Sequence, residues 1–159
     1  MLVADGVDDA TLEPVLEALR EDGAICELLA PHDGALQTAG GGEIAADRGM
    51  LTTASVLYDA VLVAGGDEAV DALQENGEAV HCASEAYKPV GAIGAGVRLL
   101  AHAPLYGACL AESPDDGLVD AAGVVTTMSN DDPQGFAEAF ARAVAQHRHF
   151  DRDVASVPA

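Results

Sequence analysis

Basic residues are scarce in this sequence. Seven Lys and Arg residues stand against 27 Asp and Glu residues, which gives a formal net charge of -20, and Lys88 is the only lysine. A surface with this charge repels phosphate backbones and anionic membranes, so we expect no nucleic acid and no membrane as partner. The acidic residues are spread along the chain and form no block. We therefore interpret the acidic residues as serving solubility or adaptation to high salt rather than as an acidic interaction surface.

The sequence also has few residues that could build a disulfide framework or a metal site. Its three cysteines, Cys26, Cys82 and Cys109, are odd in number, far apart and without a C-x-x-C pair. The five histidines include no H-x-x-x-H pair, the spacing that places two imidazoles on one face of a helix. We therefore expect structural thiols, no disulfide and no bound metal ion.

Long apolar runs and an export signal are missing as well. No apolar run approaches the ~18 residues of a membrane-spanning helix. The first residues have no basic region and include Asp5, Asp8 and Asp9, so no signal peptide is expected and the protein is predicted to be cytoplasmic. The chain has 159 residues and is 50% hydrophobic, which is enough for one globular domain. We predict a single domain over residues 1–150 and a tail over residues 151–159.

Apolar runs and helical periodicities alternate along the chain. Helices are predicted from Asp8 or Asp9 to just before Gly23, over 67–75, 78–87 and 97–101, and from Pro133 onward. Strands are predicted over 1–4, 24–30, 60–64, 105–111 and 124–127, near 88–93, and in a small hairpin made by 35–38 and 43–46. This alternation predicts an α/β sandwich with a mostly parallel sheet.

One stretch, Lys88 to Leu100, has the pattern of a strand that enters a helix through a tight glycine turn. Proteins of the α/β class place nucleophiles at such turns, at the carboxyl end of the sheet. Here position 94 is glycine and position 95 is alanine. Gly91, Gly94 and Gly96 form G-x-x-G-x-G, which differs from the dinucleotide-binding pattern G-x-G-x-x-G. The geometry of an active site is therefore expected without its nucleophile.

The glycines of this region have two interpretations. The backbone N–H groups of Gly65, Gly66, Gly94 and Ala95 could together hold a small anion. Alternatively, glycine is required because the turn is strained and the helix packs tightly on the sheet. We favour the second interpretation, because no acidic residue follows at the distance that would bind a ribose.

Two of the thiols are candidate nucleophiles outside the glycine turn. A reactive cysteine needs an electropositive and partly exposed environment. Seven basic residues in a chain with a net charge of -20 make that environment hard to build around Cys82 or Cys109. We therefore interpret both as unreactive.

Three segments carry a family resemblance: Asp5-Gly6-Val7-Asp8-Asp9, the stretch from Asp59 to Gly66, and the stretch from Ala86 to Gly96. In this order they resemble the PfpI/ThiJ family of the class I glutamine amidotransferase-like superfamily. In active members the turn is A-I-C-H-G, and an acid after the first strand supports the cysteine. The resemblance places Gly94 at the nucleophile position, Ala95 at the histidine position and Asp8 at the position of the acid, a glutamate in active members. It implies a degenerate site in which no thiolate is presented.

A closer resemblance rests on the G-V-D start, the piece Gly41-Gly42-Glu43-Ile44, the turn without cysteine, and the closing stretch from Ala145 to Phe150. Together they are similar to the C-terminal domain of large-subunit catalases. This resemblance implies a flavodoxin-like three-layer α/β/α sandwich with a structural or chaperone-like role. The implied partner is a catalase core domain, or a second copy in a homo-oligomer. No cofactor is implied for this chain, since haem and hydrogen peroxide decomposition belong to the core upstream.

Three functional hypotheses follow. The first is a non-catalytic accessory domain with a PfpI-like fold that belongs to or derives from a large catalase. The second is a PfpI-type hydrolase or glyoxalase whose nucleophile has moved to another position. The third is a small-anion-binding module built on the backbone of the two glycine turns.

Overall fold

A mostly parallel sheet lies at the centre of the molecule. The structure is a computed structural model, and it describes residues 1–84, 88–103, 105 and 108–150. The strands of this sheet are β1 (Leu29–Ala30), β4 (Arg48–Gly49), β5 (Val61–Val63), β6 (Val90–Ile93), β7 (Val119–Ala121) and β8 (Val124–Thr127). Leu2 forms single parallel bridges to Leu29 and Val63, and so joins β1 to β5. The spatial order is therefore β4, β1, Leu2, β5, β6, β8 and β7, and within it only β7 pairs antiparallel.

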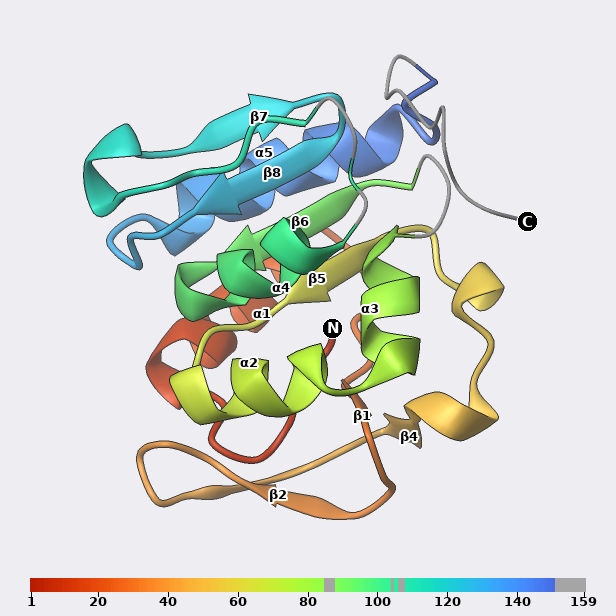
Figure 1. Cartoon of the computed structure of the whole chain (residues 1–159). Coiled ribbons are helices and arrows are strands. Elements are labelled where there is room, and N and C mark those ends of the chain that lie inside the picture. Colours follow the sequence, from red (N-terminus) through yellow and green to blue (C-terminus); the bar gives the residue numbers. More distant parts are fainter. Residues whose placement is uncertain (85–87, 104, 106–107, 151–159) are drawn as a thin grey trace.

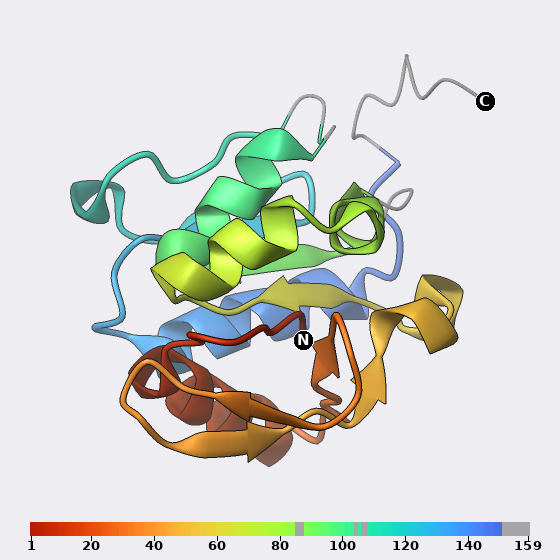
Figure 2. The same cartoon turned by 60° about the horizontal axis from the view of Figure 1, so that its bottom comes forward.

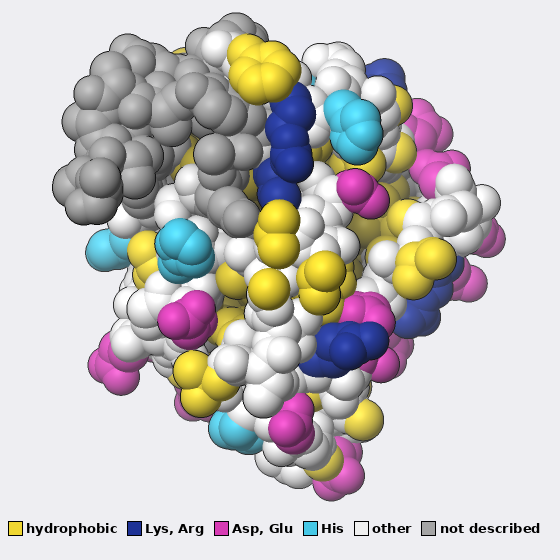
Figure 3. Space-filling model, turned by 90° about the vertical axis from the view of Figure 1, so that its right-hand side faces the viewer, with side chains coloured by type: hydrophobic (Ala, Val, Ile, Leu, Met, Phe, Trp, Pro, Cys, Tyr) yellow, Lys and Arg dark blue, Asp and Glu magenta, His cyan; other side chains and the backbone are white. Residues whose placement is uncertain are grey.

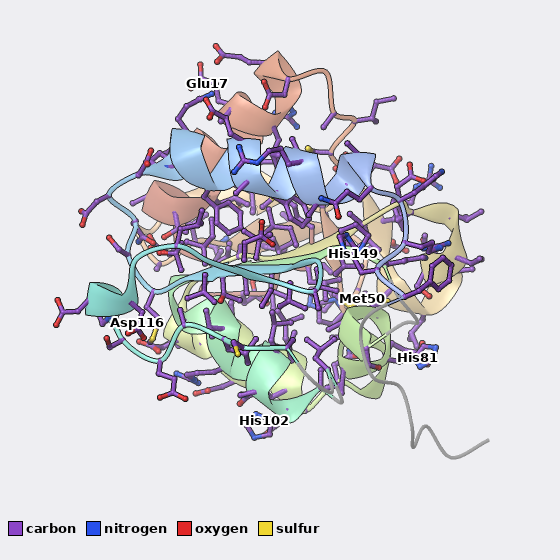
Figure 4. The ribbon with its side chains drawn as sticks, turned by 90° about the horizontal axis from the view of Figure 1, so that it is seen from above. Glu17, Met50, His81, His102, Asp116 and His149 are labelled. Carbon is purple, nitrogen blue, oxygen red and sulfur yellow. The ribbon has the colours of Figure 1, made fainter. Side chains whose placement is uncertain are left out.

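Helices cover both faces of this sheet (Figure 1). On one face α1 packs against α5, and on the other face α2, α3 and α4 contact one another. Seen from above, α1 and α5 lie on one side of the strands and α3 and α4 on the opposite side (Figure 4). The bounds are α1 Asp9–Glu21, α2 Asp67–Gln74, α3 Gly77–Ser84, α4 Val97–His102 and α5 Pro133–Ala145.

Smaller elements connect the layers. The antiparallel hairpin of β2 (Ala35–Gln37) and β3 (Glu43–Ala45) comes forward in Figure 2, beneath the main sheet. Four 3-10 turns are η1 (Met50–Thr52), η2 (Ser55–Leu57), η3 (Gly94–Gly96) and η4 (Pro114–Asp116). In the part of the chain that the structure describes, no helix is both long and apolar enough to cross a membrane.

Among the described residues, the core forms two apolar clusters, one mainly beneath α2, α3 and α4 and the other mainly between the sheet and α1 and α5. Alternate strand residues supply them, because successive side chains of a strand point to opposite faces. Leu62 belongs to the cluster of α1 and α5, whereas its neighbours Val61 and Val63 belong to the other cluster. A Cβ on Gly91 would lie 3.0 Å from the ring of Phe140, so the glycine lets α5 approach β6 closely.

Much of the architecture agrees with the sequence-based predictions. The α/β sandwich with a mostly parallel sheet is confirmed, and each predicted helix has a counterpart within a few residues of its predicted start. The hairpin around residues 35–46 is also confirmed. With Leu2 counted as the first strand and the two-residue edge strand β4 left out, the parallel strands follow the flavodoxin-like order 2-1-3-4-5.

Some strand predictions are wrong in extent. The predicted strand over 1–4 is reduced to the bridges of Leu2, and that over 24–30 to its last two residues. Just before β1, the backbone N–H of Leu28 donates to the Asp47 carboxylate at 2.7 Å. The side chain thus occupies a donor that a longer strand would use.

The predicted strand over 105–111 is also wrong for the residues that are described, 105 and 108–111. The backbone N–H of Leu105 closes a turn onto the carbonyl of Ala103, and the N–H of Ala111 donates to the hydroxyl of Thr126 at 2.9 Å. The end of the helix predicted over 78–87 and the tail over 151–159 lie outside the described residues.

Candidate functional site

The turn between β6 and α4 has the shape of a nucleophile elbow. β6 ends at Ile93, and the chain then turns through η3 into α4. Gly94, at the tip, has a φ of +57°, in the left-handed region that L side chains adopt at a cost of roughly 1–2 kcal/mol. A Cβ there would lie 3.5 Å from its nearest neighbour, Oδ1 of Asn130. The elbow therefore has room for a side chain, and glycine relieves its backbone strain.

Gly96, two residues further on, is a glycine for a different reason. Its φ of -56° is helical, so the backbone itself would accept any residue. A Cβ at this position would lie only 2.7 Å from the carbonyl oxygen of Val63. The glycine thus lets the start of α4 pack directly on β5, which is a packing requirement rather than a ligand site.

The second glycine turn holds the first loop of the chain against β5. The carbonyl of Gly65 accepts the N–H of Asp8 at 3.1 Å. Gly66 has a φ of +111°, and a Cβ there would lie 2.4 Å from the carbonyl oxygen of Gly6. A Cβ on Gly65 would lie 3.3 Å from the carbonyl oxygen of Ile93, so close contacts within the fold account for both glycines.

An open pocket of about 310 Å³ lies between these turns. It is at the carboxyl ends of the strands, where the strand order changes direction and α/β folds commonly bind ligands. It brings together the positions that the sequence analysis assigned to the degenerate site or to the anion cradle, which are Asp8, Gly65, Gly66, Gly94 and Ala95, and residues that it did not single out. The lining is Asp8, Thr11, Ala39, Gly65, Gly66, Asp67, Gly94, Ala95 and Asn130.

Asp8 is engaged as the N-cap of α1. Its Oδ1 accepts the N–H of Ala10 at 3.1 Å, and its Oδ2 accepts the hydroxyl of Thr11 at 2.5 Å. The Thr11 hydroxyl in turn accepts the amide of Asn130 at 2.7 Å. Each carboxylate oxygen therefore has a partner within this network, which ties α1 to the loop before α5.

The charge of the pocket is negative. Asp8 and Asp67 line it, and no cationic side chain is among its lining residues. Arg98 lies nearby, but its guanidinium pairs with Asp67 at 2.6 Å and with Asp71. Two carboxylates repel an anion. The arrangement therefore does not favour binding of an anion by the backbone N–H groups of Gly65, Gly66, Gly94 and Ala95.

The three thiols lie outside this pocket. Cys82 is buried on α3, Cys109 is exposed, and Cys26 is half-buried. Burial raises the pKa of the Cys26 thiol, which opposes formation of a thiolate. None of the three is among the residues that line the pocket, so none takes the place of the absent elbow nucleophile.

The pocket residues also do not fit a haem. A haem needs an axial ligand such as His, Cys, Tyr or Met, and the lining contains none of these. Its two carboxylates would also repel the propionate groups. Among the described residues, no group of three or more His, Cys, Asp or Glu is placed to hold a metal ion.

Asp8, Gly94 and Ala95, which the resemblance assigns to a degenerate site, line one pocket. Thr11 and Asn130 were not predicted. Their hydrogen bond spans 119 residues of sequence, and no local pattern reports such a contact. The spacing of Asp8 and Thr11 at a helix start was the one available signal.

The fold is shared with solved structures of the DJ-1/ThiJ/PfpI class. One is a two-domain protein from Anabaena variabilis with DJ-1/ThiJ/PfpI-like and ferritin-like domains, with a TM-score of 0.81 and 21% identity. That match covers 99% of this chain and 51% of the other. Another is a ThiJ/PfpI domain protein from Brachyspira murdochii, with a TM-score of 0.77, 19% identity and coverage of 91% and 94%. At these identities the similarity defines the fold class alone.

The sequence comparison is more specific. The family of C-terminal domains found in long catalases matches residues 2–154, and the chain belongs to this family. It is 47% identical to Catalase HPII of Mycobacterium avium over 164 residues, and 34% identical to Catalase-2 of Bacillus subtilis over 157 residues. These matches cover 100% and 97% of the chain but 23% and 21% of the relatives. The chain therefore spans about a fifth of the length of these relatives.

Proposed function

We propose that this chain is a non-catalytic accessory domain of a large catalase and has a structural role. One observation carries the proposal: the elbow keeps its turn, with a φ of +57° at residue 94, but glycine and alanine occupy the two positions that would carry the chemistry. The elbow turn is then kept because neighbouring segments pack closely on this part of the backbone, and not because the turn carries a reactive side chain. The backbone atoms that a Cβ would meet at Gly66 and at Gly96 are evidence of this close packing.

The catalytic part of such a protein lies in its core domain. In this proposal a core upstream of the domain holds the haem and decomposes hydrogen peroxide, and the partner of this chain is that core. Homo-oligomers then form through the whole catalase, in the cytoplasm. Membership of the family and the share of the relatives' length support this arrangement.

The structural role is tested by exchanging domains in the relative from Mycobacterium avium. Three forms are compared: the complete catalase, the catalase without its C-terminal domain, and a chimera with this chain in that place. We expect equal turnover per haem at 25 °C in all three, because the domain supplies no reacting group. On heating, we expect the truncated form to lose activity first and the chimera to behave like the complete enzyme. A truncated form as durable as the complete one would refute the structural role.

A chaperone-like role is a separate part of the proposal. Holding unfolded chains requires exposed apolar surface, and several large apolar side chains of this chain are exposed. The test is the aggregation of a heat-denatured client enzyme with and without the chain at equal mass. Suppression would support the role, and no suppression would leave the structural role alone.

A further inference from the structure

The open pocket beside the elbow, which we call the elbow pocket, is lined mostly by residues with little or no side chain. These residues are Ala39, Gly65, Gly66, Gly94 and Ala95. They leave a volume of about 310 Å³, at the lower end of the ~300–1,000 Å³ that is usual for ligand pockets. The remaining lining residues are polar: Asp8, Thr11, Asp67 and Asn130. The space therefore suits a small molecule, and the polar side chains determine which chemistry it accepts.

The amide of Asn130 is held in one orientation by its neighbours. The hydroxyl of Thr11 donates its single proton to Oδ2 of Asp8 at 2.5 Å, so its oxygen accepts from any further partner. Nδ2 of Asn130 is that partner, at 2.7 Å. The amide oxygen Oδ1 is therefore turned toward the elbow, where it lies 3.5 Å from the position of a Cβ on residue 94. A hydrogen-bond acceptor is thus held next to the space that Gly94 leaves.

The two carboxylates of the pocket add further acceptors. A carboxylate has about four acceptor sites, and Asp8 uses two of them for the N–H of Ala10 and the hydroxyl of Thr11. Asp67, whose side chain is 82% exposed, stands at the rim and pairs with Arg98 through Oδ1. Among the described residues its hydrogen bonds and ion pairs involve that oxygen alone. A ligand in the pocket therefore meets acceptors and has to supply N–H or O–H donors.

The local charge decides between a neutral and a cationic donor. The N-termini of α1 and α2 border the pocket, and each carries about half a positive charge. Four carboxylates in or next to these first turns outweigh that charge: Asp8, Asp9, Asp67 and Glu68. Arg98 adds one positive charge, and Asp71 beside it adds a negative one. The sum is negative, so the potential at the pocket attracts a cation.

The groups present fit an organic cation better than a metal ion. Calcium takes six to eight oxygen ligands, and among the described residues no group of three or more His, Cys, Asp or Glu is placed to hold a metal ion. A guanidinium or an alkylammonium group instead spreads several N–H donors over a wider area. Such a group could donate to Asn130 at the elbow and to Asp67 at the rim.

We propose that the elbow pocket binds a small organic cation through a guanidinium or ammonium group. The inference goes beyond the structural role and does not rest on it. Glycine at position 94 leaves the space for the ligand, the fixed amide oxygen of Asn130 accepts from it, and the carboxylates of Asp8 and Asp67 attract its charge.

NMR spectra of the 159-residue chain, recorded by proton–nitrogen correlation, test the site with methylguanidinium as the probe. In 0.1 M NaCl the screening length is about 10 Å, and we expect saturable shifts of the amide signals of Gly65, Gly66, Gly94 and Ala95. N-methylurea is a neutral molecule with similar N–H donors and should bind at least about tenfold more weakly. Equal affinity for the two probes would overturn the cationic class of ligand. Shifts confined to other residues, or none, would overturn the site.

A control is needed because a chain with a net charge of -20 attracts cations to its whole surface. In Figure 3, acidic side chains are scattered over the face in view. Asp67 and Asp71 form a matched pair, since both lie on α2 and pair with Arg98 but only Asp67 lines the pocket. Asp67→Asn should weaken binding of methylguanidinium at least about fivefold, and Asp71→Asn less than about twofold. Equal weakening would indicate general attraction to the surface and overturn the site.

The amide of Asn130 and the source of the cation are tested in the same way. Asn130→Ala should weaken binding at least about threefold, and its melting temperature shows whether the fold is kept. Unchanged binding by a folded variant would contradict the role of the amide oxygen. A Gly-Arg-Gly peptide with blocked ends carries the same guanidinium group and should bind more weakly than methylguanidinium. Tighter binding of the peptide would assign the group to a polypeptide side chain and overturn the small-molecule ligand.

Discussion

Gly94 and Gly96 are glycines for different reasons, although only one residue separates them. At Gly94 the backbone is left-handed and there is space for a side chain, whereas at Gly96 the backbone is helical and there is none. The elbow is therefore shaped by packing against β5 and does not depend on any group at its tip. The turn can therefore form without a side chain at position 94.

The difference predicts unequal effects of alanine at the two positions. Gly94→Ala should lower the free energy of unfolding by about 1–2 kcal/mol, the cost of a left-handed L residue. Gly96→Ala should lower it by about 3 kcal/mol or more, because the new Cβ meets backbone that cannot move aside. Urea denaturation measures both. A larger loss at Gly94 than at Gly96 would contradict this explanation of the turn.

The amine of Met1 predicts a dependence of stability on pH. Burial lowers its pKa from 8.0 to about 6, while neighbours including Cys26, Asp47 and Glu27 oppose the shift. Between these values the unfolded chain binds more protons, so the free energy of unfolding rises with pH from about 6 to 8 and falls again on acidification. Two pKa units correspond to about 2–3 kcal/mol.

The control for this prediction is a chain with an acetylated N-terminus. Acetylation removes the titrating group, so the rise between pH 6 and 8 should shrink by that amount relative to the free amine. Denaturant titrations at several pH values give the comparison. Identical pH profiles for the two chains would show that the amine is not responsible.

At the residue level, the sequence proposed Asp8, Gly94 and Ala95 as a degenerate site but did not predict the contacts that these residues make. Gly94, Ala95 and Asp8 follow from the order of motifs along the chain. The engagement of both Asp8 oxygens by the N–H of Ala10 and the hydroxyl of Thr11 depends on the folded loop. The sequence patterns could not predict these hydrogen bonds, because each motif was interpreted separately.

Among the elements, β7 shows why one strand escaped prediction. It is joined to β8 by a two-residue turn, Ala122-Gly123, with φ values of 51° and 73°. Positive φ at both central residues defines a type I′ hairpin turn, whose usual sequence signal is Asn-Gly or Asp-Gly. Ala-Gly lacks that signal. The helices were easier to predict, because their caps and apolar periodicities are local.

The same turn offers a stabilising substitution. Ala122→Asn should raise the free energy of unfolding by roughly 1 kcal/mol, because Asn tolerates the left-handed conformation better than Ala does. Ala122→Val, with a β-branched side chain, should lower it by a similar amount. Urea denaturation of the three chains provides the ranking. Equal stability of all three would show that the turn is not strained at this residue.

For the whole molecule, the net charge of -20 is the feature with the broadest consequence. Self-repulsion of this size destabilises the compact state, and added salt screens it. Between about 0.05 and 1 M KCl the melting temperature should rise by about 5 °C or more, since roughly 1 kcal/mol corresponds to 2–4 °C in a chain of this size. A melting temperature that does not change would remove the salt-adaptation interpretation.

At the carboxyl end of the sheet, one pocket brings together Asp8, Gly65, Gly66, Gly94 and Ala95, which are far apart in the sequence. Sequence analysis predicted the fold class and the emptied elbow, since both depend on motifs in chain order. It did not predict that Thr11 and Asn130 also line this pocket, because the hydrogen bond between them spans 119 residues of sequence. Contacts between residues that are far apart in the sequence cannot be predicted when each residue is interpreted in turn.

The proposal that this chain performs no chemistry at the elbow is decided by measuring turnover with the purified chain. An activated ester, a peptide amide and methylglyoxal are offered to the wild-type chain and to Cys26→Ser, Cys82→Ser and Cys109→Ser variants. We expect no turnover above buffer for any of these chains. Turnover by the wild type that disappears on replacement of Cys82 or Cys109 would contradict it, and would establish an enzyme with a relocated nucleophile.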